Sequence, residues 1–197
     1  MGDIILASGS ASRRALLAGA GIEAVAVKPN VDEDAAKIAM RADQVSVRDQ
    51  AMKLAEMKAV KISRTRPGLV IGGDQMLNLD GVAFDKPSDL DTAKDHLQKL
   101  SGKSHRLETA IIVAENGAPV WRYLARPKLT VRTLSNAFID KYIDDCGVSL
   151  LQTVGAYQLE GPGAQLFSEI EGDYFSILGL PLLPLLDYFR IRNVLSS

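Results

Sequence analysis

DIILASGSASRRALL, residues 3–17, is the stretch from which the fold prediction starts. Its first five residues are mostly apolar, as in a buried strand, and the serine and glycine residues that follow interrupt that strand. Ser10 or Ser12 can then cap a helix, and the alanine and leucine residues after Arg14 favour a helical conformation. The stretch therefore predicts a strand, a tight polar loop and a helix.

The polar loop has the composition of an anion-binding site. The N-terminus of a helix offers unpaired backbone N–H groups and a partial positive charge. Ser8 and Ser10 add hydroxyl groups, and Arg13 and Arg14 add guanidinium groups that bind phosphate through two hydrogen bonds. The alternative is an ordinary strand-to-helix turn with two surface arginines, because the stretch has neither the Walker A pattern nor the dinucleotide-binding fingerprint.

Composition limits the class of protein. A chain of 197 residues fits a single domain with a sizeable core. The net charge of −1 provides no global field, so we expect neither a nucleic acid nor a membrane as partner. Cys146 is the single cysteine, which excludes an internal disulfide and a zinc site built on cysteines. No apolar run is long enough to span a membrane and no signal-peptide pattern is present, so we expect a cytoplasmic protein.

Apolar periodicity predicts the elements that follow the first helix. Helices are expected at 45–62, 88–100 (capped by Ser88), 135–145 (capped by Ser135) and 182–194. Strands are expected at 22–28, 69–71, 106–113, 120–131, 165–170 and 174–178, with a hairpin at 76–84.

Two acidic positions are candidates for chemistry. Glu33 belongs to an acidic run, residues 31–34, in an expected loop; the run is a metal-ligating carboxylate site, a solvated charge cluster or a helix N-terminus. Asp74 follows an apolar strand and two glycines, and ligands of open α/β sheets bind beyond the carboxyl ends of strands. Asp74 is therefore a candidate metal ligand or general base, with a turn cap as the alternative.

Basic residues complete this set. Lys58 and Lys86 are candidate phosphate ligands, although each could be an ordinary solvated lysine. Lys86 precedes a proline and is therefore expected in an extended segment. His105 is either a base or a structural histidine near a turn. Carboxylates for a divalent metal and cations for phosphates are the parts that metal-assisted phosphoryl chemistry needs, so the residues alone indicate an α/β enzyme with a phosphate ligand.

The chain also resembles the Maf family of nucleoside triphosphate pyrophosphatases, nearly from end to end. The matching segments occur in the family's order. They are LASGSASRR at 6–14, Glu33, Leu54-Ala55 to Lys58-Ala59, Gly72-Gly73-Asp74-Gln75, Lys86-Pro87, Leu100-Ser101-Gly102 to His105, Gly155-Ala156-Tyr157 and Gly179-Leu180-Pro181.

The resemblance implies an architecture, a reaction and a cofactor. The fold would be mixed α/β, with an elongated twisted sheet flanked by helices, as in inosine triphosphatase-like proteins, and with a cleft between two lobes of a single domain over 1–197. The reaction would be hydrolysis of a nucleoside triphosphate to the monophosphate and pyrophosphate, with Mg²⁺ or Mn²⁺. House-cleaning of modified nucleotides is the implied role, and the sequence leaves open whether the protein forms a homodimer.

The resemblance also assigns roles to individual positions. Asp74 matches the proton acceptor, and Glu33 matches a metal-binding acid that acts together with Asp74. The phosphate-contact positions of the family match Ser8, Ser10, Arg13, Arg14, Lys58 and Lys86.

Three further positions bear on the substrate. Members of the family that act on dTTP and UTP usually carry arginine, threonine and glutamine where this chain has Ser12, Gln75 and Glu160. Gln75 and Glu160 resemble instead the subgroup that acts on 7-methyl-GTP, which tends to carry tryptophan at the Ser12 position. A carboxylate at Glu160 can accept hydrogen bonds from both donors of guanine and favours a cationic methylated base. The expected substrate is therefore 7-methyl-GTP. The alternatives are a dTTP/UTP or broad modified-nucleotide pyrophosphatase, and a non-catalytic nucleotide-binding regulator of cell division.

Overall fold

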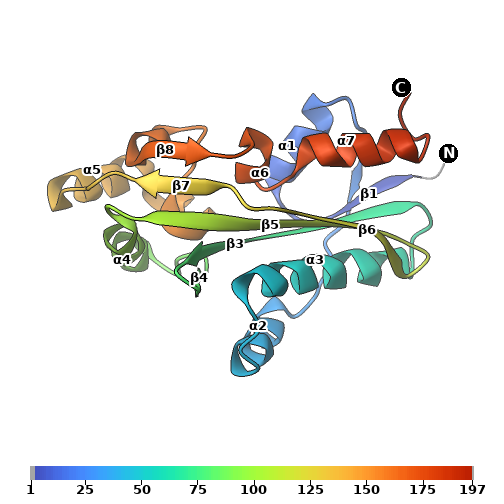
Figure 1. The fold of residues 1–197 in the computed structure, drawn as a ribbon, viewed down its shortest axis with the longest axis horizontal. Coiled ribbons are helices and arrows are strands. Elements are labelled where there is room, and N and C mark those ends of the chain that lie inside the picture. The colour runs from blue at the N-terminus through green and yellow to red at the C-terminus, as the bar shows by residue number, and fades with distance from the viewer. Residues whose placement is uncertain (1–2, 197) are drawn as a thin grey trace. The chain divides into compact units, whose positions relative to one another are not determined.

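A mixed β-sheet of eight strands, flanked by helices, forms the framework of the computed structural model, which describes residues 3–196 (Figure 1). The strand order is β2-β1-β3-β5-β7-β8, with β4 paired to β3 and β6 paired to β5. β1 runs parallel to β2 and β3, whereas β5, β6, β7 and β8 pair in antiparallel fashion. This arrangement confirms the predicted α/β class with a mixed sheet.

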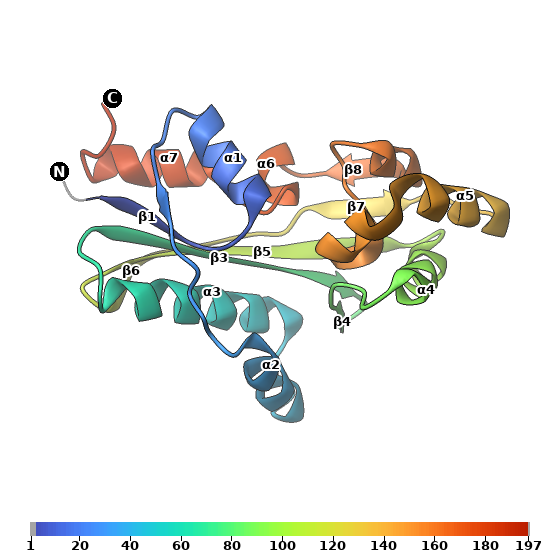
Figure 2. The same ribbon diagram turned by 180° about the vertical axis from the view of Figure 1, so that it is seen from behind.

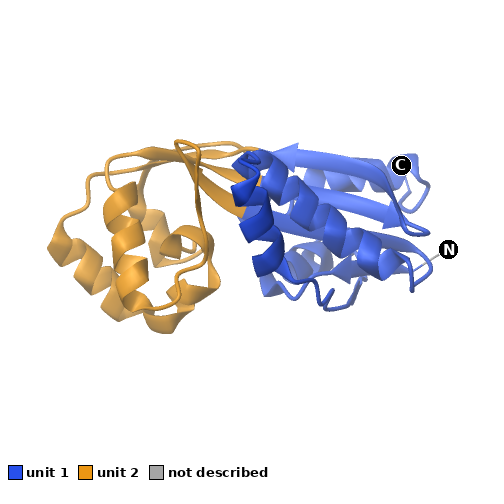
Figure 3. Ribbon diagram, turned by 90° about the horizontal axis from the view of Figure 1, so that it is seen from below, with its two compact units in different colours: residues 1–75, 109–125, 173–197 blue, residues 76–108, 126–172 orange. Residues whose placement is uncertain are grey.

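The chain divides into two compact units (Figure 3). Unit 1 contains the described residues up to 75, 109–125 and those from 173 onward, and unit 2 contains 76–108 and 126–172. The long strands β3 and β5 contribute residues to both units.

The elements of unit 1 come from both ends of the chain and from its middle. They are β1 (Ile4–Ala7), α1 (Ala11–Gly19), β2 (Val25–Ala26), α2 (Glu33–Ala42), α3 (Val47–Ser63), the first part of β3 (Leu69–Leu79), the second part of β5 (Ser104–Glu115), β6 (Ala118–Ala125), α6 (Tyr174–Ile177) and α7 (Leu182–Ile191). Unit 2 holds the remainder of β3 and β5 together with β4 (Val82–Phe84), α4 (Leu90–Leu100), β7 (Lys128–Val131), α5 (Asn136–Cys146), η1 (Gly147–Gln152), η2 (Val154–Ala156), η3 (Pro162–Leu166) and β8 (Phe167–Glu171).

The core of unit 1 lies on both faces of β1 and β3, because alternate side chains of a strand point to opposite faces. Leu6 and Ile71 pack in one apolar cluster with Phe189 of α7. Ile5 belongs to a second cluster with Ile62 of α3. Figure 2 shows α1 and α7 on one side of these strands and α3 on the other. Both faces of the strands are covered, which explains why their sequences are continuously apolar.

Side-chain caps start the main helices where the sequence indicated. Ser10 accepts a hydrogen bond from the Arg13 backbone N–H at the start of α1, and Ser135 caps α5 in the same way. Ser46 caps α3, which begins at Val47, two residues after the predicted start of this helix. Each hydroxyl satisfies one of the backbone donors that a helix N-terminus leaves unpaired.

The acidic run 31–34 is a helix N-terminus, one of the three alternatives, because Asp32 caps α2, which begins at Glu33. Two local predictions were wrong because an aspartate cap was overlooked. Residues 174–178 do not form a strand, because Asp173 accepts hydrogen bonds from two backbone N–H groups and begins the short helix α6. Asp89, not Ser88, caps α4.

Strand boundaries also differ from the prediction. The expected strand 120–131 is two strands, β6 and β7, separated at Pro127, which has no backbone N–H to donate to a sheet. The expected strand 22–28 is reduced to the two residues of β2. Conversely, β3 continues without a break through Gly72, Gly73 and Asp74.

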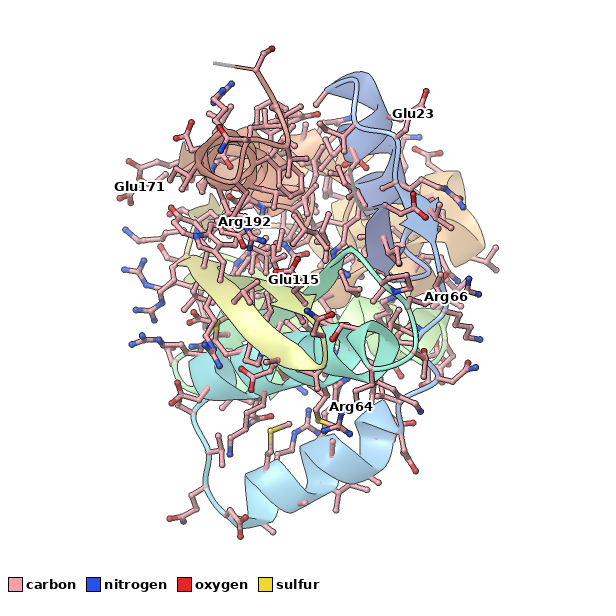
Figure 4. The ribbon with its side chains drawn as sticks, turned by 90° about the vertical axis from the view of Figure 1, so that its right-hand side faces the viewer. Glu23, Arg64, Arg66, Glu115, Glu171 and Arg192 are labelled. Atoms are coloured by element: carbon pink, nitrogen blue, oxygen red, sulfur yellow. The ribbon has the colours of Figure 1, made fainter. Side chains whose placement is uncertain are left out.

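An ion pair and a hydrogen bond connect the segment after α7 to β5 and to α7 within unit 1. Arg192, which follows α7, donates from Nη2 to Glu115 of β5 at 2.8 Å and from Nη1 to the Tyr188 hydroxyl at 2.8 Å (Figure 4).

Over residues 3–196, no helix has the length and apolar character that a membrane span requires.

Candidate functional site

The loop after β1 lies beside the centre of β3. Ala7, the last residue of β1, pairs with Gly72 in the parallel register of the two strands. Ser8 therefore follows β1 at the level where β3 reaches Gly73 and Asp74. The loop for which the sequence predicted an anion site therefore lies at the carboxyl end of β1, next to Gly73 and Asp74. The prediction that Asp74 follows the end of its own strand is wrong, because β3 continues to Leu79.

Arg13 joins the three backbone segments that surround this point. Its Nε donates to the Gly179 carbonyl oxygen at 2.7 Å, and its Nη1 donates to the Gly73 carbonyl oxygen at 2.9 Å and to the Ser8 hydroxyl at 3.2 Å. Burial lowers the pKa of Arg13, and the nearby carboxylates of Asp74 and Glu33 oppose that shift. A contact between Arg13 and phosphate stays a prediction, and Nη2 is the nitrogen left for it.

Close packing of α3 on β3 determines where the catalytic candidates meet. A Cβ atom at Gly72 would collide with the Ala55 carbonyl oxygen and would lie 2.7 Å from the Ala59 Cβ. Only glycine permits this approach of helix to strand. Asp74, two residues after Gly72, faces the same side of the sheet and so points toward α3, which carries Lys58.

Lys58, Asp74 and Glu33 form a charged cluster in this packed region. The Lys58 Nζ atom lies 2.7 Å from Asp74 Oδ1 and 2.8 Å from Glu33 Oε2. Lys58 and Asp74 are buried, whereas the Glu33 side chain is 38% exposed. The cluster has two carboxylates for one lysine, and it reaches solvent on the side of Glu33.

This donor set fits a small divalent cation. Two carboxylates already converge on one positive charge, and oxygen is the ligand atom that Mg²⁺ and Mn²⁺ prefer. Within residues 3–196, no three or more His, Cys, Asp or Glu side chains come together in a group that could hold a metal. Mg²⁺ is commonly held by only one or two carboxylates, with phosphate and water completing its coordination.

Gln75 faces the opposite side of β3 from Asp74. Its Nε2 atom donates to the Thr109 hydroxyl at 2.9 Å, the Ser176 carbonyl oxygen at 3.1 Å and the Ile177 carbonyl oxygen at 3.0 Å. Gln75 is half-buried, so part of its side chain remains accessible. The sequence analysis identified Gln75 but missed Thr109. Thr109 could have been noticed only as a polar residue directly before the apolar run of β5.

The other predicted site residues are distributed over both units. Ser12 and Arg14 are exposed on α1, next to the buried Arg13. Lys86, directly before Pro87, and Glu160, between η2 and η3, are exposed residues of unit 2. The structure thus brings Ser8, Arg13, Glu33, Lys58 and Asp74 together within unit 1, and the roles predicted for all these residues stay predictions.

Unit 2 contains a second buried charged group, which the sequence analysis did not identify. Glu108 of β5 is fully buried and accepts hydrogen bonds from Arg126 Nε at 2.8 Å, Arg126 Nη2 at 3.0 Å and Asn78 Nδ2 at 2.9 Å. Both carboxylate oxygens therefore have partners. His105 is buried as well, with its Nε2 atom 2.8 Å from the Tyr157 hydroxyl, which supports the structural interpretation of this histidine.

Comparison with known proteins relates this arrangement to one family. The family model described as "Maf-like protein" matches residues 3–191. A nucleoside triphosphate pyrophosphatase from Hyphomonas neptunium is 68% identical over 194 residues, which cover 98% of each chain. A protein of the same name from Caulobacter vibrioides is 51% identical over 98% of this chain and 97% of its own. A 7-methyl-GTP pyrophosphatase from Mesorhizobium japonicum is 47% identical over 98% of both chains. On this evidence the chain belongs to the Maf family.

Proposed function

We propose that this protein hydrolyses a nucleoside triphosphate to the monophosphate and pyrophosphate. The observation that carries the proposal is the cluster of Lys58, Asp74 and Glu33, in which a buried carboxylate adjoins the donor-rich loop after β1. Membership of the Maf family and the names of its pyrophosphatase relatives support the reaction class.

In this proposal Asp74 is the general base. Water must attack the α-phosphorus, and a carboxylate at hydrogen-bond distance can orient that water and take its proton. The Lys58 ammonium, 2.7 Å away, restrains the Asp74 side chain and offsets its charge. Ser8, Ser10 and the backbone N–H groups at the start of α1 would bind phosphate oxygens, with Arg14 adding positive charge. Lys86 is a further phosphate ligand that we propose from the family resemblance alone.

Glu33 and Asp74 would hold the divalent metal. When bound, Mg²⁺ or Mn²⁺ supplies charge neutralisation at the phosphates. Glu33 is suited to this role because it is half-exposed at the first position of α2, where its side chain can move from Lys58 to an incoming cation.

We further propose that the substrate is 7-methyl-GTP. Gln75 and Glu160 are the residues that support this choice, since both offer oxygen acceptors and guanine carries two adjacent donors, its N1–H and its amino group. Relatives from Mesorhizobium japonicum and Brucella abortus, 47% and 46% identical to this chain, bear the name 7-methyl-GTP pyrophosphatase.

A substrate panel tests both parts of the proposal. Purified protein with Mg²⁺ or Mn²⁺ is incubated with 7-methyl-GTP, GTP, UTP, dTTP and CTP, and released pyrophosphate is distinguished from single phosphate. Preferred release of pyrophosphate from 7-methyl-GTP is the expected result. A preference for UTP or dTTP would retain the reaction and overturn the substrate. Absence of turnover with every nucleotide and both metals would overturn the reaction and favour a nucleotide-binding regulator.

A further inference from the structure

The hydrogen bonds around Gln75 fix the orientation of its side-chain amide. Two of the three groups next to Nε2 are backbone carbonyl oxygens, those of Ser176 and Ile177, and a carbonyl oxygen can only accept. The opposite orientation of the amide would place Oε1 against both carbonyl oxygens, and none of the three acceptors would then receive a hydrogen bond from Gln75. The amide nitrogen must therefore face α6.

As a consequence, the amide oxygen is the polar atom that Gln75 presents. In residues 3–196, no donor is recorded within hydrogen-bond distance of Gln75 Oε1. This atom lies near Gly179, where an added Cβ would be 3.9 Å from it. Gln75 thus offers an acceptor only, and the protein has already engaged its donors.

Thr109 is the side chain that completes this arrangement. It is fully buried, and its hydroxyl accepts from Gln75 Nε2 at 2.9 Å while donating to the Ser176 carbonyl oxygen at 3.0 Å. The same carbonyl receives a hydrogen bond from Gln75. The hydroxyl therefore joins the Gln75 side chain to the backbone of α6.

Asp173 holds the other end of the network. Its Oδ2 atom accepts from the Ser176 backbone N–H at 2.8 Å and from the Ser176 hydroxyl at 2.5 Å. The backbone of Ser176 is thus fixed through its N–H group as well as through its carbonyl group. The orientation of Gln75 depends on a short helix that is itself held by side chains.

We infer that Thr109 is a positioning residue that locks Gln75 with its oxygen directed at the substrate base. The inference rests on the proposed function and deepens it: a fixed acceptor selects a base that presents an N–H group. Guanine offers its N1–H and its amino group, whereas uracil and thymine offer one N–H each. Thr109 makes no contact with substrate in this account and acts only through Gln75.

Three variants test the inference. Thr109→Val removes the hydroxyl at nearly constant volume, Thr109→Ser retains it, and Gln75→Met removes the amide. We measure kcat and KM for 7-methyl-GTP and UTP. Thr109→Val is expected to lower the ratio of the two kcat/KM values by about five- to tenfold, mainly through KM for 7-methyl-GTP, as the loss of an uncharged hydrogen bond would give. Thr109→Ser should restore the ratio, and Thr109→Val should have no further effect in the Gln75→Met background.

A spectroscopic readout separates positioning from loss of folding. In the wild-type protein the Gln75 side-chain NH₂ protons should exchange slowly with solvent, and in Thr109→Val they should exchange faster. Thr109→Ala replaces Thr109→Val in both assays if the valine variant does not fold.

An unchanged substrate ratio and unchanged exchange in the folded variant would overturn the inference while leaving the proposed function intact. An unchanged ratio in Gln75→Met would also overturn it, because Gln75 would then not read the base. Absence of turnover in the wild-type protein would overturn the proposed function and this inference with it.

Discussion

Each unit of the molecule contains a buried carboxylate within a cluster of charged side chains, and the two clusters differ in how their carboxylates are paired. In unit 2 the Glu108 carboxylate receives two hydrogen bonds from Arg126 and one from Asn78, so that both of its oxygens have partners. In unit 1 a single Lys58 ammonium faces both Asp74 and Glu33. The first cluster is complete within the protein. In the second, two carboxylates share one lysine, and the nearby Arg13 guanidinium is hydrogen-bonded instead to carbonyl oxygens and to the Ser8 hydroxyl.

The difference separates a structural ion pair from a candidate site. A buried charge must be paired to persist, so burial alone does not distinguish the two clusters. A carboxylate with access to solvent, as at Glu33, does, because it retains the capacity to bind a cation or to take a proton. We therefore expect substitutions in the unit 1 cluster to affect turnover and those in the unit 2 cluster to affect stability.

The largest expected effect is that of Asp74→Asn on turnover. The substitution removes the proposed base but leaves Lys58 paired with Glu33, so the fold should persist while kcat falls at least about a hundredfold. Pyrophosphate release from the preferred nucleotide measures the first effect, and thermal unfolding measures the second.

Asp187→Asn serves as the matched control for Asp74→Asn. Asp187 is an exposed residue of α7 that pairs with Arg190, so the same chemical change should leave turnover at the wild-type level. Near-normal activity of folded Asp74→Asn protein would refute the role of Asp74 as base.

The next effect, on stability rather than on turnover, is expected for Arg126→Met. This change leaves the fully buried Glu108 without its charged partner and should lower the free energy of unfolding by about 3 kcal/mol. Turnover by the folded protein should be retained. Urea unfolding measures the stability.

Lys141→Met is the control for Arg126→Met, because it breaks an exposed ion pair with Asp145 and should leave the unfolding midpoint unchanged. If both variants were equally stable, the buried Glu108 carboxylate would not need Arg126 for stability.

The smallest effect at near-neutral pH concerns a buried group that is neutral rather than charged. Burial lowers the pKa of His105 to about 4 from its ordinary value of 6.5. Between these pH values the unfolded chain binds a proton that the folded chain does not. Above pH 6.5 the titration of His105 should therefore not reduce the free energy of unfolding. As the pH decreases from 6.5 toward 4, it should lower the free energy of unfolding by up to about 1.4 kcal/mol per pH unit.

Comparison with His105→Gln isolates this contribution. Urea unfolding of both proteins at several pH values gives the difference in free energy of unfolding, in which His96 and the carboxylates cancel. The difference should vary with pH across this window, and a difference independent of pH would show that His105 titrates alike in both states.

Much of the fold follows from local patterns in the sequence. The mixed α/β class, the polar loop after β1 and the Ser10 and Ser135 caps were predicted, because apolar periodicity and capping residues act over a few neighbouring positions. The failures have local causes too. In 174–178 the aromatic residues favour a strand, but Asp173 binds two backbone N–H groups and stabilises a helical turn instead.

The candidate site was predictable in its residue types but not in its contacts. Asp74, Glu33 and Lys58 could be named as candidates from their charge and from the family resemblance. That Lys58 lies between the two carboxylates could not be predicted, since it depends on how α3 packs on β3. The engagement of Arg13 by the carbonyl groups of Gly73 and Gly179 likewise joins segments far apart in the chain.

The glycine at position 72 has a consequence for how mutational data on this protein should be read. A methyl group there would push α3 away from β3 and carry Lys58 away from Asp74, although Gly72 itself has no functional group. In a systematic screen of variants selected on activity, Gly72→Ala would score with the catalytic positions. A loss-of-function map of this chain therefore marks the places where backbones touch as well as those where chemistry occurs.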